Sequence, residues 1–201
     1  MVDRTGEKMN YSYEIKDSWN YFRSLSDDMA QTARYVEPIG QEKVYSIEFA
    51  KIIILSCTEL ESVLKALCFG IDGSECGNIG QYKEKVLGRF PHIVEAVVEI
   101  PRTGAQLKPF EGWDSGPLSW WDAYTDVKHT RGKLFSQASY QNALYALSAL
   151  YISILYYSEF SNVKLHTADG GYLSSDYSDT IISFGRIKSL PDFEKSEGTG
   201  H

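Results

Sequence analysis

A long segment without charge most constrains how this chain can fold, because no charged residue stands between Lys133 and Glu159. Its apolar residues go nearly all round a helix, which is typical of a helix buried in a core or in a membrane. The segment is long enough to span a membrane, but Gln, Asn and Ser interrupt it, as do the polar tips of Tyr145, Tyr151, Tyr156 and Tyr157. We therefore predict a buried central helix that begins at Ser136 or Ser139 and ends near Phe160, with no membrane partner. The same tyrosines are expected to cover a second surface, because one packing partner is too few for such a helix, and this predicts a homodimer.

Four further helices are expected from apolar positions spaced three and four residues apart. Their expected bounds are Asp17 or Ser18 to about Val36, Gln41 to Phe69, Ile79 to Phe90, and Ser119 to about Gly132. Between 91 and 115, β-branched residues and Pro and Gly favour a short β-hairpin or an ordered loop. The sequence thus predicts an all-α, up-and-down helical bundle of about five main helices with a small irregular or β insertion.

The chain divides by composition into a helical bundle domain at 1–165 and a C-terminal extension at 166–201. The extension is polar and rich in glycine, and within it 180–184 favours a short strand. Its end, LPDFEKSEGTGH, has the composition of a disordered tail. We therefore expect a peripheral extension that is partly disordered.

Charge and cysteine content narrow the function classes. A net charge of -7 argues against a general nucleic-acid coat protein, although it leaves room for a local basic pocket. The three cysteines show no CxxC spacing, so neither a zinc site nor a disulfide framework is predicted. The polar N-terminus lacks the apolar core of a signal peptide. We expect a cytoplasmic protein with no metal and no cofactor.

One short segment, 119–132, holds the densest group of chemically useful side chains: Trp120, Trp121, Tyr124, Asp126, Lys128, His129 and Arg131. On a regular helix Trp120, Tyr124 and Arg131 share one face, with Lys128 beside them. His129 points nearly the opposite way, so a joint His129–Arg131 site needs a distorted helix end or a second subunit.

Two interpretations of Arg131 follow from this helical face. The favoured one is packing against Trp120 and Tyr124 with a buried carboxylate partner, for which Glu61 is the candidate. The other is an anion or phosphate clamp assisted by Lys128. For His129 we likewise favour a structural histidine over a general base.

Polar residues on the first two long helices are interpreted mainly as solvated faces, among them Asp28, Gln31, Glu48 and Lys51. Glu61 lies at the edge of the polar stripe of its helix, four residues before Lys65. An exposed pair between these two, contributing a few tenths of a kcal/mol, is the favoured interpretation. The alternative is a carboxylate turned toward a neighbouring helix.

The segment WWDAYTDVKHTRGKLFSQASYQNALYALSAL resembles the HEPN-type helical proteins, and TARYVEP, YSIEFAKIII and ELESVLKALC fit the same resemblance upstream. The resemblance covers roughly 18–160. It implies an up-and-down bundle that often dimerises. Active members are metal-independent ribonucleases, in which an Arg and a His that follows it at a short spacing act on the scissile phosphate and the ribose hydroxyl. Inactive members are nucleotide-binding, dimerisation or toxin–antitoxin partner modules.

This chain departs from the ribonuclease motif. The residues after Arg131 are GKLFSQASY, without a His, while His129 precedes the Arg, and Thr125 stands where the resembling sequences often have Asn. The resemblance therefore favours a non-catalytic binding or dimerisation module of a bacterial defence or stress system, with a protein, RNA or nucleotide as its partner. The alternative is a metal-independent endoribonuclease that uses His129 as base and Arg131 with Lys128 on the phosphate.

Overall fold

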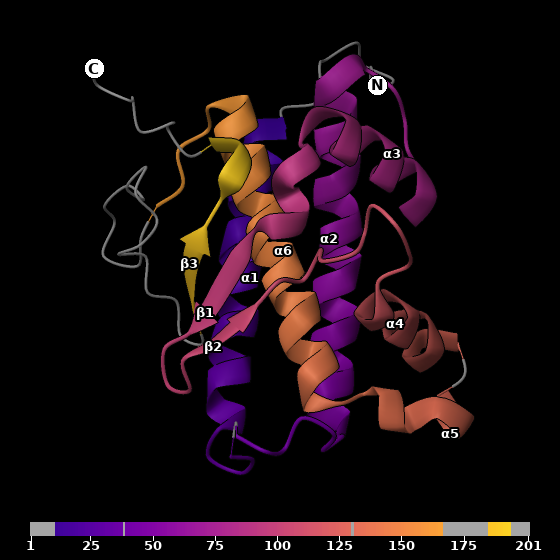
Figure 1. Cartoon of the computed structure of the whole chain (residues 1–201), viewed down its shortest axis with the longest axis vertical. Helices are drawn as coiled ribbons and strands as arrows, with labels where there is room; N and C mark the ends of the chain where they lie inside the picture. The colour runs from indigo at the N-terminus through magenta and orange to yellow at the C-terminus, as the bar shows by residue number, and fades with distance from the viewer. Residues whose placement is uncertain (1–10, 38, 130, 167–184, 194–201) are drawn as a thin grey trace.

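Helix α6 (Tyr140–Ser161) lies in the middle of the computed structural model of the chain, with α1 (Tyr11–Thr32) and α2 (Ile47–Asp72) packed along it (Figure 1). The structure describes residues 11–37, 39–129, 131–166 and 185–193. Every residue of α6 from 146 to 158 is buried. The predicted buried central helix is thus confirmed, and no helix among the described residues is long and apolar enough to cross a membrane.

The chain itself covers α6, which removes the reason given above for a homodimer. Tyr151, Tyr156 and Tyr157 are buried within the single chain, and Tyr145 packs against the same core. The expectation that these tyrosines form a second surface is wrong, because α1, α2 and α4 (Ser119–His129) surround the helix that carries them. The homodimer itself stays a prediction and needs another surface.

Two serine caps set where the long helices begin. Ser139 precedes α6 and accepts a hydrogen bond from the Asn142 amide, as one of the two predicted starts requires. Ser46 caps α2 by accepting from the Phe49 amide. The predicted start of α2 at Gln41 is therefore wrong. Residues 41–46 instead run beside 137–141, where the Tyr140 amide donates to the Val44 carbonyl at 2.8 Å.

The remaining helices flank α2. Helix α3 (Ile79–Arg89) and helix α4 pack against it, and a short α5 (Arg131–Leu134) follows α4 (Figure 1). Within the described part of the chain, α1, α2, α3, α4 and α6 are the five main helices. The predicted helical bundle is therefore confirmed.

A three-stranded antiparallel sheet covers one side of the bundle, in the order β2-β1-β3 (Figure 1). Strands β1 (Val97–Ile100) and β2 (Ala105–Leu107) form a hairpin, which confirms the β insertion predicted between 91 and 115. The turn between them contains Gly104 at a φ of 69°, a left-handed conformation that glycine adopts without strain. Strand β3 (Arg186–Ser189) comes from the C-terminal extension and pairs with the other edge of β1.

The described end of the extension belongs to the core. Leu190 is buried, and the Phe193 ring packs against Phe90 and Tyr156 with centroids 5.5 and 5.0 Å apart. The Tyr156 hydroxyl donates to Asp192 at 2.9 Å. The predicted disordered tail is thus wrong for residues 190–193, because these side chains complete the core beside α6. The strand predicted at 180–184 lies outside the described residues.

Candidate functional site

Three of the predicted site residues, Glu61, Tyr124 and Lys128, meet between α2 and α4, and we call them the α4 cluster. The Tyr124 hydroxyl donates to Glu61 Oε1 at 3.2 Å and accepts a hydrogen bond from Lys128 Nζ at 2.9 Å. Tyr124 and Lys128 lie four residues apart on α4, so both project from one face of that helix. A buried phenol therefore links a carboxylate on α2 to an ammonium on α4.

Three groups in or beside the α4 cluster, Lys128, Cys57 and Tyr82, have a raised pKa. The hydrogen bond to Tyr124 raises the pKa of Lys128, so this lysine stays an ammonium at neutral pH. Burial raises the pKa of the adjacent Cys57 thiol, and Glu61 adds to that effect. Burial and then Glu61 raise the pKa of Tyr82 on α3 to about 12. None of these three groups is thus activated as a nucleophile or general base near pH 7.

Glu61 shows how tertiary packing decided between two interpretations of one residue. Its carboxylate faces Tyr124 on α4, and within the described residues no ion pair joins it to Lys65, which is exposed. The favoured surface pair is therefore wrong and the alternative is confirmed.

The other predicted site residues do not converge with the α4 cluster into one site. Trp120 is 2% exposed and donates from its indole nitrogen to the Pro109 carbonyl at 2.7 Å, so it fastens α4 to the loop before it. His129 is exposed at the end of α4, and Asp126 is half-buried two residues from Tyr124. The backbone of Arg131 begins α5, but its side chain lies outside the described part of the structure. Its predicted stacking and pairing with Glu61 stay predictions.

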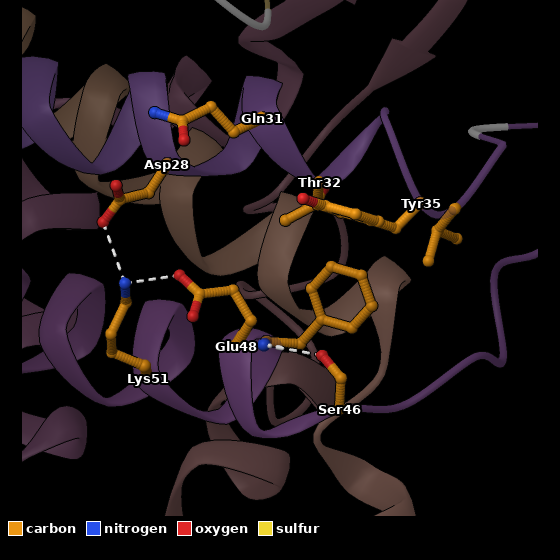
Figure 2. Close-up of a pocket in the computed structure, with 9 residues that line it drawn as sticks. Asp28, Gln31, Thr32, Tyr35, Ser46, Glu48 and Lys51 are labelled. Carbon is orange, nitrogen blue, oxygen red and sulfur yellow. Dashed lines mark hydrogen bonds and ion pairs between the residues drawn. The ribbon is translucent and has the colours of Figure 1, made fainter.

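A separate cavity of about 500 Å³ lies between the end of α1 and the beginning of α2, and we call it the α1–α2 pocket. Figure 2 shows the residues that line it converging from the two helices. They are Asp28, Gln31, Thr32, Tyr35, Val36, Ser46, Glu48, Phe49 and Lys51. Sequence reasoning missed this pocket, because Asp28 and Lys51 were both interpreted as parts of solvated faces.

Lys51 joins two carboxylates at the edge of the α1–α2 pocket. Its ammonium lies 3.0 Å from Asp28 Oδ2 and also contacts Glu48 Oε1 (Figure 2). The hydrogen bond that Lys51 donates to Glu48 is the main cause that raises the pKa of Lys51, and Asp28 adds to it. The spacing of Glu48 and Lys51 was a readable signal, since residues three apart on a helix are neighbours. Nothing local in the sequence predicts that Asp28 joins them.

Exposed apolar side chains gather at the same end of the bundle, the end that also holds residues 39–46 and α5 (Figure 1). Of the six exposed large hydrophobic residues in the described chain, five belong to this end: Tyr35, Ile39, Tyr45, Ile47 and Leu134. We call this group the loop end. Tyr45 packs edge-on against Phe135, with ring centroids 5.9 Å apart, so the segment before α2 contacts the residue that follows α5.

The comparisons add no identity to these observations. No family model, no curated protein and no solved structure matches this chain. Among the described residues, no group of His, Cys, Asp and Glu side chains could hold a metal ion. The candidate sites are therefore judged by their geometry alone. They are the α4 cluster, whose side chains bond to one another, the open α1–α2 pocket and the apolar loop end.

Proposed function

We propose that this chain is a non-catalytic, HEPN-like dimerisation module that associates with a second copy of itself through the loop end. The supporting observation is the gathering of exposed hydrophobic residues there, with Tyr35 87%, Ile47 69% and Ile39 64% exposed. Exposed large apolar side chains that gather at one end of a protein favour an interaction site there. The resemblance to HEPN-type proteins, which often dimerise, supports a role in a bacterial defence or stress system.

Charge at the loop end supports a second copy as the partner. The whole chain has a net charge of -7, which opposes association of two copies. Residues 33–51, however, contain three basic and three acidic residues and so carry no net charge. Two copies that approach through residues 33–51 bring together apolar side chains within a segment whose charges balance. A homodimer built there also leaves α6 buried within each chain.

The oligomeric state of single-surface variants tests this proposal. We expect sedimentation velocity to show a dimer for the wild type at micromolar concentration and a monomer for the double variant Ile39→Ser/Ile47→Ser. Tyr21→Ser is the matched control, because Tyr21 is 39% exposed on α1, away from the loop end. A wild-type monomer, or a double variant that dimerises as well as the wild type, would refute dimerisation through this surface.

The alternative, a metal-independent ribonuclease, has less support from the described side chains. Lys128 already bonds Tyr124, and the carboxylate of Glu61 lies next to that hydroxyl, so a substrate phosphate would compete with these partners. We expect no cleavage of mixed RNAs in the presence of EDTA. Cleavage by the wild type that disappears in a folded His129→Ala variant would establish the ribonuclease in place of the non-catalytic module.

A further inference from the structure

We propose that the α1–α2 pocket binds a small organic ammonium compound, in which a primary ammonium is attached to an apolar body. This proposal does not rest on the dimerisation proposed above and needs no second copy, although the pocket shares Tyr35 with the loop end. Its volume of about 500 Å³ lies within the range of pockets that hold small molecules. Of its nine lining residues, six are polar or charged, and Tyr35, Val36 and Phe49 supply the apolar side chains.

The charges of the pocket favour a cation. Asp28 and Glu48 together carry two negative charges, and Lys51 supplies one positive charge. Lys51 uses Oδ2 of Asp28 and Oε1 of Glu48. In the described part of the chain, Asp28 Oδ1 and Glu48 Oε2 have no hydrogen-bond partner. A ligand ammonium that bonds to either free oxygen leaves the two contacts of Lys51 in place, and it brings the pocket to neutrality.

The beginning of α2 also lies at the pocket, and a helix N-terminus by itself favours an anion. Here Glu48 already stands in the first turn of α2 and supplies the negative charge that this end attracts. Asp28 comes from the facing helix and adds a second. The two carboxylates oppose binding of an anion, so the ammonium remains the better ligand.

Apolar side chains provide the surface for the body of the ligand. The exposed Tyr35 and the half-buried Val36 offer most of this surface. Phe49 also lines the pocket but is only 1% exposed, and Tyr140 holds it edge-on with ring centroids 5.4 Å apart. Val36 packs against the core beside it, and Tyr35 is exposed at the rim. The Ser46 cap fixes the backbone at Phe49. Because these groups are already held in place, binding needs little reorganisation of the protein.

Three probes with the same apolar body and different charge test the pocket: phenylbutylamine, phenylbutanol and phenylbutyrate. In a titration of the full chain followed by amide chemical shifts, we expect the amine to give saturable shifts in residues 28–36 and 46–51. The alcohol should bind about tenfold more weakly, since it forms no charge-assisted hydrogen bond. The butyrate should not bind. Equal binding of all three probes, tighter binding of the butyrate, or no shift with the amine would overturn the proposal.

Variants assign the effect to the two carboxylates. Asp28→Asn/Glu48→Gln should weaken the amine about tenfold and leave the alcohol unchanged, because it removes charge and keeps the shape of the pocket. Glu75→Gln is the control, since Glu75 is exposed in the loop after α2. Amine binding that is unchanged in the folded double variant would refute the site. The dimer-disrupting Ile39→Ser/Ile47→Ser variant should keep amine binding, because neither residue lines the pocket, so either proposal can fail alone.

Discussion

The α4 cluster and the α1–α2 pocket both join an ammonium to carboxylates across two helices, yet they differ in what they leave open. In the α4 cluster one lysine and one glutamate meet through the hydroxyl of Tyr124, and each charge has its partner. In the α1–α2 pocket two carboxylates share Lys51 beside a cavity of about 500 Å³. The density of polar residues along the sequence thus pointed to the α4 cluster, whose polar groups bond to one another. The α1–α2 pocket differs because carboxylate oxygens without a protein partner lie beside empty space there.

Two tyrosines, one in the α4 cluster and one at the α1–α2 pocket, differ in the same way. Tyr124 is 3% exposed and holds α4 to α2, whereas Tyr35 is 87% exposed at the rim of the pocket. The first side chain contributes to the stability of the fold, because its ring is buried and its hydroxyl is bonded. The second is free to contact a ligand or another protein.

The largest expected effect contrasts these two tyrosines. Tyr124→Ala should lower the free energy of unfolding by about 3–5 kcal/mol, because it leaves a cavity and removes the link between Glu61 and Lys128. Tyr35→Ala should change it by no more than about 0.5 kcal/mol. Urea denaturation of both variants measures the difference. Equal losses would mean that the α4 cluster is no more structural than the pocket rim.

A smaller effect is expected for the carboxylate of the α4 cluster. Glu61→Ala removes the acceptor of the Tyr124 hydroxyl and should lower the free energy of unfolding by about 1–2 kcal/mol. The exposed Glu75→Ala is the matched control and should change it by less than about 0.5 kcal/mol. The melting temperatures of the two variants provide the measurement. If they coincide, the bond between Glu61 and Tyr124 does not stabilise the fold.

The smallest effect concerns Glu99 in the sheet. There two basic side chains share one carboxylate, whereas in the pocket two carboxylates share one lysine. Arg186 at 2.7 Å and Lys188 at 3.3 Å both contact this one carboxylate, and Arg186 is the main cause that lowers its pKa. Because the folded pKa lies below the unfolded value, the charge of Glu99 stabilises the fold above about pH 4.3, the ordinary glutamate value. This contribution is lost as the pH falls through the folded pKa.

Comparing the wild type with Glu99→Gln across this pH range tests the assignment. The variant should be slightly less stable at pH 7, and the gap should close as the pH falls below the folded pKa. Denaturant midpoints at several pH values measure the gap. A gap that stays constant with pH would show that the charge of Glu99 does not stabilise the sheet.

Local chemistry in the sequence predicted much of the fold. The uncharged segment predicted a central helix, Ser139 marked one of its two possible starts, and the β-branched residues near 97–100 predicted the insertion. The predicted start of α2 was wrong, because the pairing of 41–46 with 137–141 is a contact between segments far apart in the sequence. The prediction of a disordered tail was wrong at residues 190–193 for the same reason. The composition of the whole segment LPDFEKSEGTGH is typical of a tail, while the apolar surface that holds Phe193 comes from Phe90 and Tyr156.

For the candidate sites too, the sequence predicted the local features and not the contacts between distant segments. Helical periodicity by itself determined which residues share a face, so it placed Tyr124 beside Lys128 and Glu61 at the edge of its polar stripe. It could not determine what lies across from each face, because that depends on how helices distant in sequence pack together. Only the tertiary structure turned Glu61 toward Tyr124 rather than Lys65 and brought Asp28 to Glu48 and Lys51 beside a cavity. Spacing along a helix is a local property of the chain, whereas an enclosed volume arises only where two packed surfaces leave space between them.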